Sequence, residues 1–220
     1  GAVWVGTRQG LYRTEGNSTV RMREASIVAL AFAPDGELWA CTSGGVLYRG
    51  ADWERVADAG AITQAPVVGL AVGSDGTVWL ASENGLGRLL PDDTTALHTE
   101  KNELLSRDVR ALCMAPEDTL WIATGGGLAR YLTTGRWTRF TVDSTGGGLR
   151  SKGLRELHID EAGNLWIATV AGISFRTPDA DWSYYDLPTA QCVLSVGDGA
   201  FWVGTRGGLY RLRDTLFTAV

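Results

Sequence analysis

Short apolar runs, separated by turns rich in Gly and Asp, follow one another along the whole chain. The clearest is a phrase that occurs six times: Trp, small or β-branched residues, Thr or Ser, a Gly-containing turn, Leu or Ile, and then Arg. The copies begin at Trp4, Trp39, Trp79, Trp121, Trp166 and Trp202, which gives a period of about 40 residues. Such a period predicts repeated supersecondary units that stack on one another to bury their faces.

Each phrase predicts two strands joined by a tight turn, and two further runs complete a unit. An apolar run and a Gly/Asp turn precede each of the last five tryptophans, which is a hairpin signal. These first strands are 28–32, 68–72, 110–114, 155–159 and 192–196. Residues expected at the same position of successive units form a column. One column is Leu30, Leu70, Leu112, Leu157 and Leu194, and the next is Ala31, Ala71, Cys113, His158 and Ser195. The fourth strands are 18–23, 53–57, 95–99, 137–142, 182–187 and 215–220. No apolar stripe has a period of 3.6 residues, so almost no helix is expected.

Four-stranded meanders with two apolar faces pack well when they are arranged radially, so the pattern favours an all-β fold, a β-propeller. A β-sandwich is the alternative, but it does not need near-identical units at one period. Because the phrase and the run after it occur six times, six blades are favoured; because no run precedes Trp4, the first blade is expected to have three strands. Five and seven blades remain alternatives. One domain, 1–220, is expected, with repeats at about 1–23, 24–58, 59–100, 101–142, 143–187 and 188–220. Ring closure would then bring Arg8 near Arg206.

The segment Gly163–Ile173, GNLWIATVAGI, and its five relatives resemble the two-component regulator propeller repeat. That repeat occurs in the extracytoplasmic sensor regions of bacterial hybrid histidine kinases and in some free-standing propellers. The resemblance implies a sensor or interaction domain in an extracytoplasmic or periplasmic setting, and it leaves the cytoplasm open. The family's kinase, receiver and helix-turn-helix modules have no match in these residues.

Composition narrows the range of partners. With 45% hydrophobic and 20% charged residues, the composition is typical of a globular protein. The net charge of −5 argues against a dedicated nucleic-acid partner, because such binding relies on many Lys and Arg residues, so none is expected. No apolar run approaches the length of a membrane helix, about 20 residues, so direct membrane insertion of this segment is not expected. Cys41, Cys113 and Cys192 form no CxxC pair, and all three are expected to be reduced and buried. Two histidines are too few for a His-rich metal site, and no metal is expected. No cofactor is expected either.

Residues that recur in every unit are expected to be structural. The six tryptophans should pack in the core. The Thr/Ser column should hydrogen-bond its own turn. The column of arginines at strand ends should satisfy carbonyls or a carboxylate; its members are Arg13, Arg49, Arg88, Arg130, Arg176 and Arg211. Function is expected where the copies differ.

The copies differ most in two places: the turn between the second and third strands, and the connection from the fourth strand to the next unit. This topology places both at one end of the units, and loops on a rigid scaffold are where binding residues concentrate. The candidates for ligand or partner binding are Arg8, Ser43, Glu83, Asn84, Lys101, Arg107, Arg150, Lys152 and Arg206. The Gly-rich connection 143–153 lacks GK[ST] and a following helix, so it is no phosphate loop. A flexible surface connection and a ligand contact are both open for it.

The preferred function is a non-catalytic ligand- or protein-recognition propeller, the sensor or interaction portion of a bacterial signalling protein. Its partner would be a small molecule, anionic if it bridges Arg8 and Arg206, or a protein, including a second copy of the chain. One alternative is a lyase- or hydrolase-like enzyme acting through His158 and a carboxylate such as Glu83 or Asp108. Streptogramin B lyases carry a related repeat, but no stretch here matches their His motif. A purely structural interaction scaffold is the other alternative.

Overall fold

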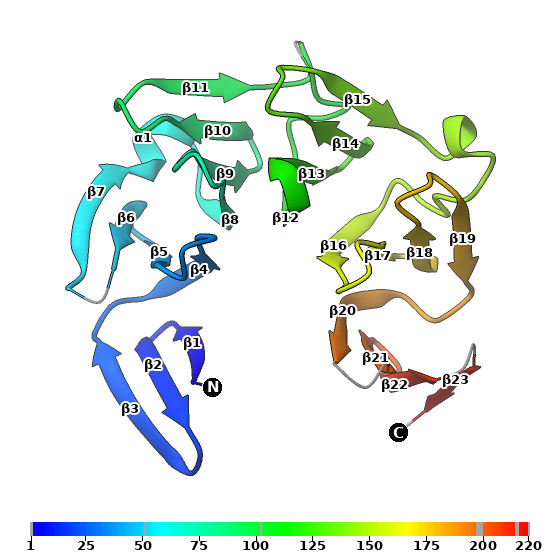
Figure 1. Ribbon diagram of the computed structural model, residues 1–220, viewed down its shortest axis with the longest axis horizontal. Helices are drawn as coiled ribbons and strands as arrows, with labels where there is room; N and C mark the ends of the chain where they lie inside the picture. The colour runs from blue at the N-terminus through cyan, green and yellow to red at the C-terminus, as the bar shows by residue number, and fades with distance from the viewer. Residues whose placement is uncertain (1, 51, 102, 197–199, 214–215, 220) are drawn as a thin grey trace. The chain divides into compact units, whose positions relative to one another are not determined.

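The computed structural model describes residues 2–50, 52–101, 103–196, 200–213 and 216–219. They form six antiparallel sheets, one of three strands and five of four, and within each sheet the strands are paired in chain order (Figure 1). The fold is an all-β propeller of six blades, as the sequence predicts, and the first blade is the three-stranded one. By their contacts the residues group into two compact units, Gly1–His98 and Thr99–Val220. The single-domain organisation stays a prediction.

The first unit holds blades 1 to 3. Blade 1 consists of β1 (Val3–Thr7), β2 (Gly10–Glu15) and β3 (Ser18–Arg23). Blade 2 consists of β4 (Ile27–Phe32), β5 (Leu38–Thr42), β6 (Val46–Arg49) and β7 (Glu54–Asp58). Blade 3 consists of β8 (Val67–Val72), β9 (Val78–Ser82), β10 (Gly85–Leu89) and β11 (Thr95–His98).

The second unit holds blades 4 to 6. Blade 4 consists of β12 (Val109–Ala115), β13 (Thr119–Thr124), β14 (Gly127–Tyr131) and β15 (Trp137–Phe140). Blade 5 consists of β16 (Leu154–Ile159), β17 (Leu165–Thr169), β18 (Gly172–Arg176) and β19 (Trp182–Tyr185). Blade 6 consists of β20 (Ala190–Val196), β21 (Ala200–Thr205), β22 (Gly208–Arg213) and β23 (Leu216–Ala219).

Helix is confined to short connections: α1 (Ala59–Thr63) and the 3-10 turns η1 (Pro116–Asp118) and η2 (Asp143–Thr145). Asp58 begins α1 by accepting a hydrogen bond from the Ala61 N–H at 3.0 Å, and the left-handed Gln64 (φ 54°) ends it. The expectation of almost no helix is confirmed. In the described part of the chain, no helix is long and apolar enough to cross a membrane.

The recurring Thr or Ser closes the turn between the two strands of the phrase. Thr124 shows the pattern: its Oγ1 donates to the Gly127 carbonyl at 2.8 Å and accepts from the Gly126 N–H at 3.2 Å. Thr7, Ser82, Thr169 and Thr205 donate in the same way to the glycine three residues on. Gly127 has φ +143°, and a Cβ there would lie 2.7 Å from the Phe140 carbonyl oxygen, so this turn requires glycine.

Four of the six repeated tryptophans are buried: Trp39, Trp79, Trp121 and Trp166 are 3–6% exposed. Trp39, Trp121 and Trp166 belong to apolar clusters that join each blade to the next one along the chain. Trp4 and Trp202 are half-buried. The blade of Trp4 lacks the first strand that the other blades have. The blade of Trp202 is the last described blade of the second unit, so no later blade of that unit packs on Trp202.

Two column assignments made from the sequence are off by one residue: Leu194 with its neighbour Ser195 in blade 6, and Arg176 in blade 5. In blade 6, Val193 pairs with the second strand β21 at the position equivalent to Leu112 in blade 4. Leu194 pairs with Trp202 as Cys113 pairs with Trp121, and Ser195 pairs with Phe201. Leu194 is therefore 55% exposed rather than in the core column. A shift of one residue moves a side chain to the other face of a sheet, because the side-chain period of a strand is two.

The second correction concerns Arg176. In blade 5, Phe175 pairs with Trp166, and Arg176 pairs with Leu165 on the opposite face of the sheet. Arg176 is 8% exposed and lies against Trp121 of blade 4. Burial lowers the pKa of Arg176, and the neighbouring Arg130 lowers it further. Arg49, Arg88, Arg130 and Arg211 instead lie over the tryptophan of their own repeat.

The cysteine expectation holds in part. All three thiols are unbonded, and Cys41 is buried, but Cys113 is half-buried and Cys192 is exposed. By strand pairing Cys192 corresponds to Ala111 of β12, which packs in the cluster shared with blade 5. Among the residues that the structure describes, the second unit has no blade after blade 6 to pack on Cys192 in the same way. The prediction that all three are buried is therefore wrong for Cys192.

Candidate functional site

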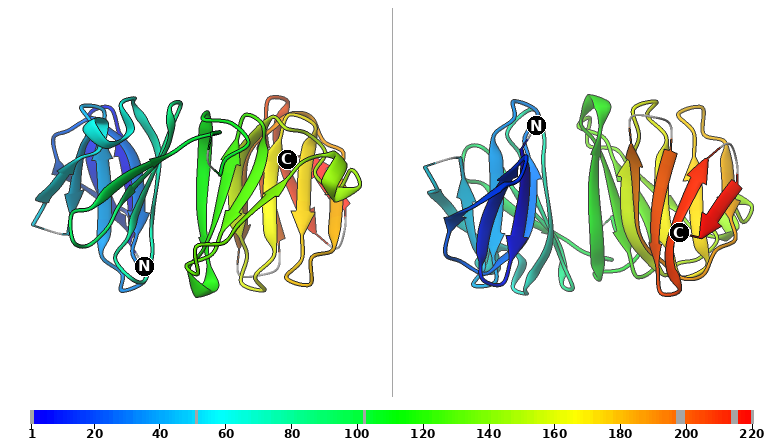
Figure 2. Two further views of the ribbon diagram at one scale, coloured as in Figure 1. Left: turned by 90° about the horizontal axis from the view of Figure 1, so that it is seen from above. Right: turned by 90° about the horizontal axis from the view of Figure 1, so that it is seen from below.

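The candidate site lies at the end of the blades that carries the turn between the two phrase strands and the connection to the next blade. We call this the loop end. The strands of each unit run between two layers of turns, of which the loop end is one (Figure 2). In five blades the first strand carries a β-bulge close to the loop end. The bulged residues are Val28, Val68, Arg110, Arg155 and Gln191.

A bulge leaves one residue unpaired and re-aims its side chain, which is why bulges are common beside functional sites. In the second unit the bulged residues are polar, and both Arg110 and Arg155 are exposed. In the first unit both are exposed valines, 41% and 48%. The bulges therefore distinguish the two units chemically at equivalent positions.

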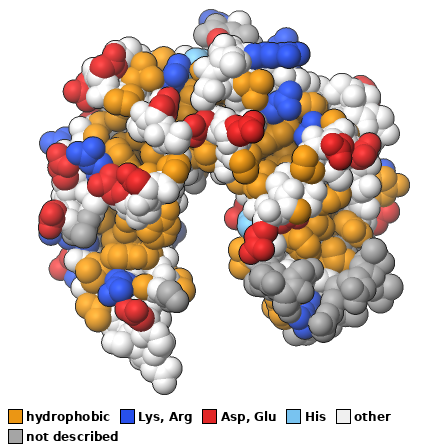
Figure 3. All heavy atoms as spheres, viewed as in Figure 1, with side chains coloured by type: hydrophobic (Ala, Val, Ile, Leu, Met, Phe, Trp, Pro, Cys, Tyr) orange, Lys and Arg blue, Asp and Glu red, His pale blue; other side chains and the backbone are white. Residues whose placement is uncertain are grey.

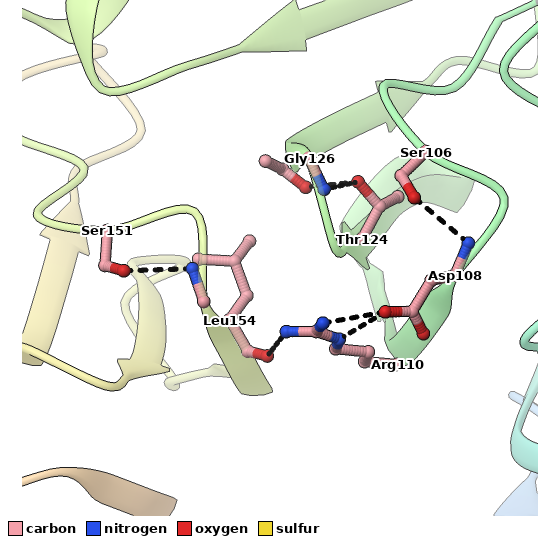
Figure 4. A network of polar contacts seen from close by, with 9 residues as sticks. Ser106, Asp108, Arg110, Thr124, Gly126, Ser151 and Leu154 are labelled. Atoms are coloured by element: carbon pink, nitrogen blue, oxygen red, sulfur yellow. Dashed lines mark hydrogen bonds and ion pairs between the residues drawn. The ribbon is translucent and has the colours of Figure 1, made fainter.

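Arg110 is the most firmly positioned of these side chains (Figure 4). Its Nε and Nη2 donate to Asp108 Oδ2 at 2.9 and 2.7 Å, and its Nη1 donates to the Leu154 carbonyl at 3.4 Å. The Asp108 N–H in turn donates to Ser106 Oγ at 3.2 Å. Arg110 thus ties β12 to β16, and the guanidinium, which has five N–H donors, keeps donor capacity for a further acceptor.

The connection 143–153, which leads from blade 4 to blade 5, is anchored to blade 5. Leu149 is fully buried, and its N–H donates to Thr145 Oγ1 at 2.9 Å. The Arg150 N–H donates to the buried Ser174 Oγ at 2.9 Å, and the Arg150 side chain pairs with Asp186 at 3.2 Å. Lys152 is exposed.

The structure places the remaining predicted candidates individually. Arg8, Ser43, Glu83, Lys101 and Arg206 are exposed in turns. Asn84 is half-buried and donates to the Thr63 carbonyl at 3.0 Å, so it holds α1 against blade 3. Arg107 pairs with Glu100 at 3.1 Å. Because Arg8 and Arg206 belong to different units, their proximity stays a prediction.

Arg110 and Arg155 were not among the predicted site residues, although the sequence carries a signal for them. Both stand at a strand position where the first two copies have Val28 and Val68. A charged residue where other copies have valine is a departure between copies, but the predicted candidates were sought only in turns and in the connections between units. The bulge that makes the position exposed is visible only in the strand pairing.

His158 has a hydroxyl partner in the next blade. Its Nε2 lies 2.6 Å from Ser195 Oγ and accepts from the Ser195 N–H at 3.2 Å, which favours the neutral ring with the proton on Nδ1. Burial lowers the pKa of His158, while the charge of Asp160 partly opposes this. The Asp108 carboxylate, named above as a possible catalytic partner, is instead bonded to Arg110.

In the described part of the chain, no group of three or more His, Cys, Asp or Glu side chains is arranged to hold a metal ion.

Comparison with known proteins gives solved structures of the same fold. The chain is similar to the extracellular domain of the hybrid two-component system BT3049 from B. thetaiotaomicron, with a TM-score of 0.79, 19% identity and 100% of this chain covered. The corresponding domain of BT4673 from the same organism gives a TM-score of 0.78 and 20% identity, again over 100% of this chain. Virginiamycin B lyase from Staphylococcus aureus gives 0.70 and 16%, covering 88% of this chain and 69% of the lyase.

No family model matches the chain, and no curated protein does. The chain spans 32% of each of the two extracellular domains, about a third of their length. At these identities the likeness establishes the fold. The resemblance noted in the repeat is thus matched by the structural neighbours, which include extracellular propeller domains of two-component systems.

Proposed function

We propose that this chain is a non-catalytic recognition propeller, the sensor or interaction portion of a bacterial signalling protein. The observation that carries the proposal is the likeness to extracellular domains of two hybrid two-component systems over the whole of this chain. A fold by itself does not define a function, so the proposal needs a site. The loop end of the second unit is the best candidate for it.

The ligand we propose for that end is a small anion. Arg110 and Arg155 occupy equivalent bulges on the adjacent strands β12 and β16, and the Leu154 carbonyl that accepts from Arg110 belongs to the residue before Arg155. Asp108 neutralises part of the positive charge of Arg110. The side chain of Arg155 is exposed and can reach a ligand from solvent. A carboxylate or phosphate group would form charge-assisted hydrogen bonds with both guanidinium groups.

The test is a thermal-shift screen of the 220-residue chain with anionic, neutral and cationic small molecules. A ligand that binds only the folded state raises the melting temperature in a saturable way, because it stabilises by RT ln(1 + [L]/Kd). Arg155→Ala should raise the Kd of an anionic ligand about tenfold, so that about ten times more ligand is needed for the same rise in melting temperature. The matched control is Arg139→Ala, an exposed arginine on the outer strand β15, which should leave the effect unchanged.

The same experiment separates the other functions. The bound molecule should be recovered chemically unchanged, as mass spectrometry can show. Conversion to a product would favour an enzyme. If no small molecule stabilises the chain, the interaction scaffold becomes the better proposal.

One contact favours a second candidate, a hydrolase- or lyase-like activity. Ser195 Oγ lies 2.6 Å from His158 Nε2, the distance at which a histidine can take a proton from a serine nucleophile. If this pair acts, any turnover of a candidate substrate must be lost in both Ser195→Ala and His158→Ala, and retained in Cys113→Ala, which changes the position in blade 4 equivalent to His158.

A further inference from the structure

A cavity of about 470 Å³ lies between blades 2 and 3, at the end of the strands opposite the loop end. Blade 2 contributes the turn after β4 together with Trp39 and Arg49, and blade 3 contributes the turn after β8 and the turn after β10. Its volume falls in the range of small-ligand sites. In Figure 3, acidic and basic side chains border apolar surface on the blades of this unit.

Trp39 in the wall of this cavity has an unsatisfied hydrogen-bond donor. The residue is 6% exposed, and its indole Nε1 is buried with no hydrogen-bond partner in the described part of the chain. The guanidinium of Arg49 lies 5.7 Å from the ring centroid, but a guanidinium has donors only. A buried N–H without an acceptor is unfavourable, so an acceptor brought by a ligand would be bound there.

In blade 5 a carboxylate satisfies the equivalent donor. There the equivalent Trp166 Nε1 donates to Asp160 Oδ2 at 2.9 Å. Asp160 occupies the first position of the turn between the first two strands, where its N–H donates to the Asn164 carbonyl and its carbonyl accepts from Gly163.

Ala33 occupies the same position in blade 2. Its N–H donates to the Glu37 carbonyl at 2.9 Å, and its carbonyl accepts from the Gly36 N–H at 2.8 Å. The methyl group of Ala33 therefore stands where blade 5 has a carboxylate. This one difference leaves the Trp39 indole without an acceptor, and both Ala33 and Trp39 line the cavity.

The cavity is strongly acidic. Its carboxylates are Asp35, Glu37, Glu54, Asp75 and Asp93, and its cations are Arg49 and Arg55. Arg49 is already paired with Glu54 at 2.6 Å and lies 3.8 Å from Glu37. Asp35 and Asp75 accept hydrogen bonds within their own turns. Asp93 makes no side-chain hydrogen bond or ion pair in the described part of the chain, so the cavity keeps an excess of negative charge.

We propose that this cavity binds a basic peptide segment. A Lys or Arg side chain of the peptide lies against Asp93 and the other unneutralised carboxylates. One peptide carbonyl accepts the hydrogen bond from Trp39 Nε1, which the protein covers in the free state and which the peptide uncovers on binding. The ligand must bring a cation and an acceptor together. A simple polyamine has no acceptor, and a carboxylate ligand would be repelled.

The experiment uses the 220-residue chain and the probe N-acetyl-Ala-Lys-Ala-amide, with the Glu peptide and the norleucine peptide as controls. The indole N–H resonance of Trp39, assigned by its loss in Trp39→Phe, should move downfield and saturate with the Lys peptide alone. Trp39→Phe should weaken binding about tenfold, the effect of losing one hydrogen bond. Asp93→Asn should weaken it and reduce its dependence on salt.

Ala33→Asp is the decisive variant, since it adds a negative charge and also supplies the carboxylate that blade 5 has. The proposal expects at least about tenfold weaker binding, because the indole gains an internal acceptor and the space is filled. Attraction by the carboxylates alone predicts tighter binding. The matched control Asp160→Ala, which makes the reverse change in blade 5, should leave binding of the peptide unchanged.

The proposal is overturned if the Lys peptide shows no saturable shift, if the Glu or norleucine peptide binds equally, or if Ala33→Asp binds as well as the parent. Circular dichroism checks that each variant is folded. If Ala33→Asp is not, Trp39→Phe and Asp93→Asn decide. The site and ligand charge differ from those proposed for the loop end, so either proposal can fail without the other.

Discussion

Arg176 lies over Trp121 of the neighbouring blade, with its guanidinium carbon 5.3 Å from the ring centroid. Arg130 of the same repeat as Trp121 lies 5.6 Å from that centroid. One indole therefore receives guanidinium groups from two blades. It also contacts Phe140, whose ring centroid is 5.6 Å away, and belongs to the apolar cluster that joins blades 4 and 5.

Trp121→Ala is expected to lower the free energy of unfolding by about 3–5 kcal/mol, the usual cost of removing a buried aromatic side chain. Trp4→Ala should cost less, because Trp4 occupies the same repeat position but is half-buried. Denaturant unfolding of both variants, followed by circular dichroism, measures the difference. Equal losses would contradict the importance assigned to the first strand, which blade 1 lacks.

Asp160 should make stability depend on pH. Burial raises its pKa, but hydrogen bonds from Trp166, from the side chain and N–H of Asn164 and from the Ala162 N–H together bring it below its ordinary value. A carboxyl whose folded pKa is lowered contributes stability above its unfolded pKa, about 3.9, and that contribution is lost as the pH falls through the folded value.

We therefore expect Asp160→Asn to be less stable than the parent at pH 7 and to approach it in acid. Denaturation midpoints between pH 7 and pH 2 measure this. Asp179→Asn, an exposed aspartate of the same blade, is the control. A difference between parent and Asp160→Asn that does not change with pH would show that the carboxylate's charge has no role.

Glu156 should act in the opposite direction. Burial raises its pKa, and a hydrogen bond from the Val193 N–H opposes this only in part. The folded state then binds the proton more tightly than the unfolded chain, so stability falls as the pH rises through the unfolded and then the folded pKa. Glu156→Gln should raise the unfolding midpoint at pH 8 and lose its advantage near pH 4. Exposed Glu161→Gln is the control, and equal behaviour of the two variants would refute the prediction.

The three thiols should differ in reactivity. Burial, with the charge of Asp58, raises the pKa of Cys41 to about 11, and burial raises the pKa of Cys113 to about 11. Cys192 is exposed. At pH 8 a thiol reagent should label one cysteine of the native protein rapidly, and Cys192→Ser should abolish that phase. Rapid labelling of Cys41 would contradict its burial.

Blade 1 should be the least protected part of the chain. It lacks a first strand, and all six residues of β3 are exposed. Amides of 3–23 should therefore exchange with deuterium faster than those of blade 4, since exposed strand hydrogen bonds open more readily. Equal protection would mean that another copy of the chain supplies the missing strand. Light scattering would then show a dimer.

The strands and their order could be read from the sequence because a propeller blade is a local structure. Its turns need Gly, Asp and Thr at set places, and its Trp recurs at one strand position, so period and composition alone predict six blades with an incomplete first one. The same locality explains why the Thr124 turn and its relatives were predicted correctly.

The tertiary structure decided which face each side chain occupies. In four repeats the Leu of the first strand stands nine residues before the Trp, as Leu112 does before Trp121, whereas Leu194 stands eight before Trp202. That single residue turns Leu194 outward, because strand faces alternate at every residue. The contact of Arg176 with Trp121, the pairing of His158 with Ser195 and the cavity beside Trp39 all join two blades. Such relationships depend on how separate sheets pack, which a pattern repeated within each sheet does not determine.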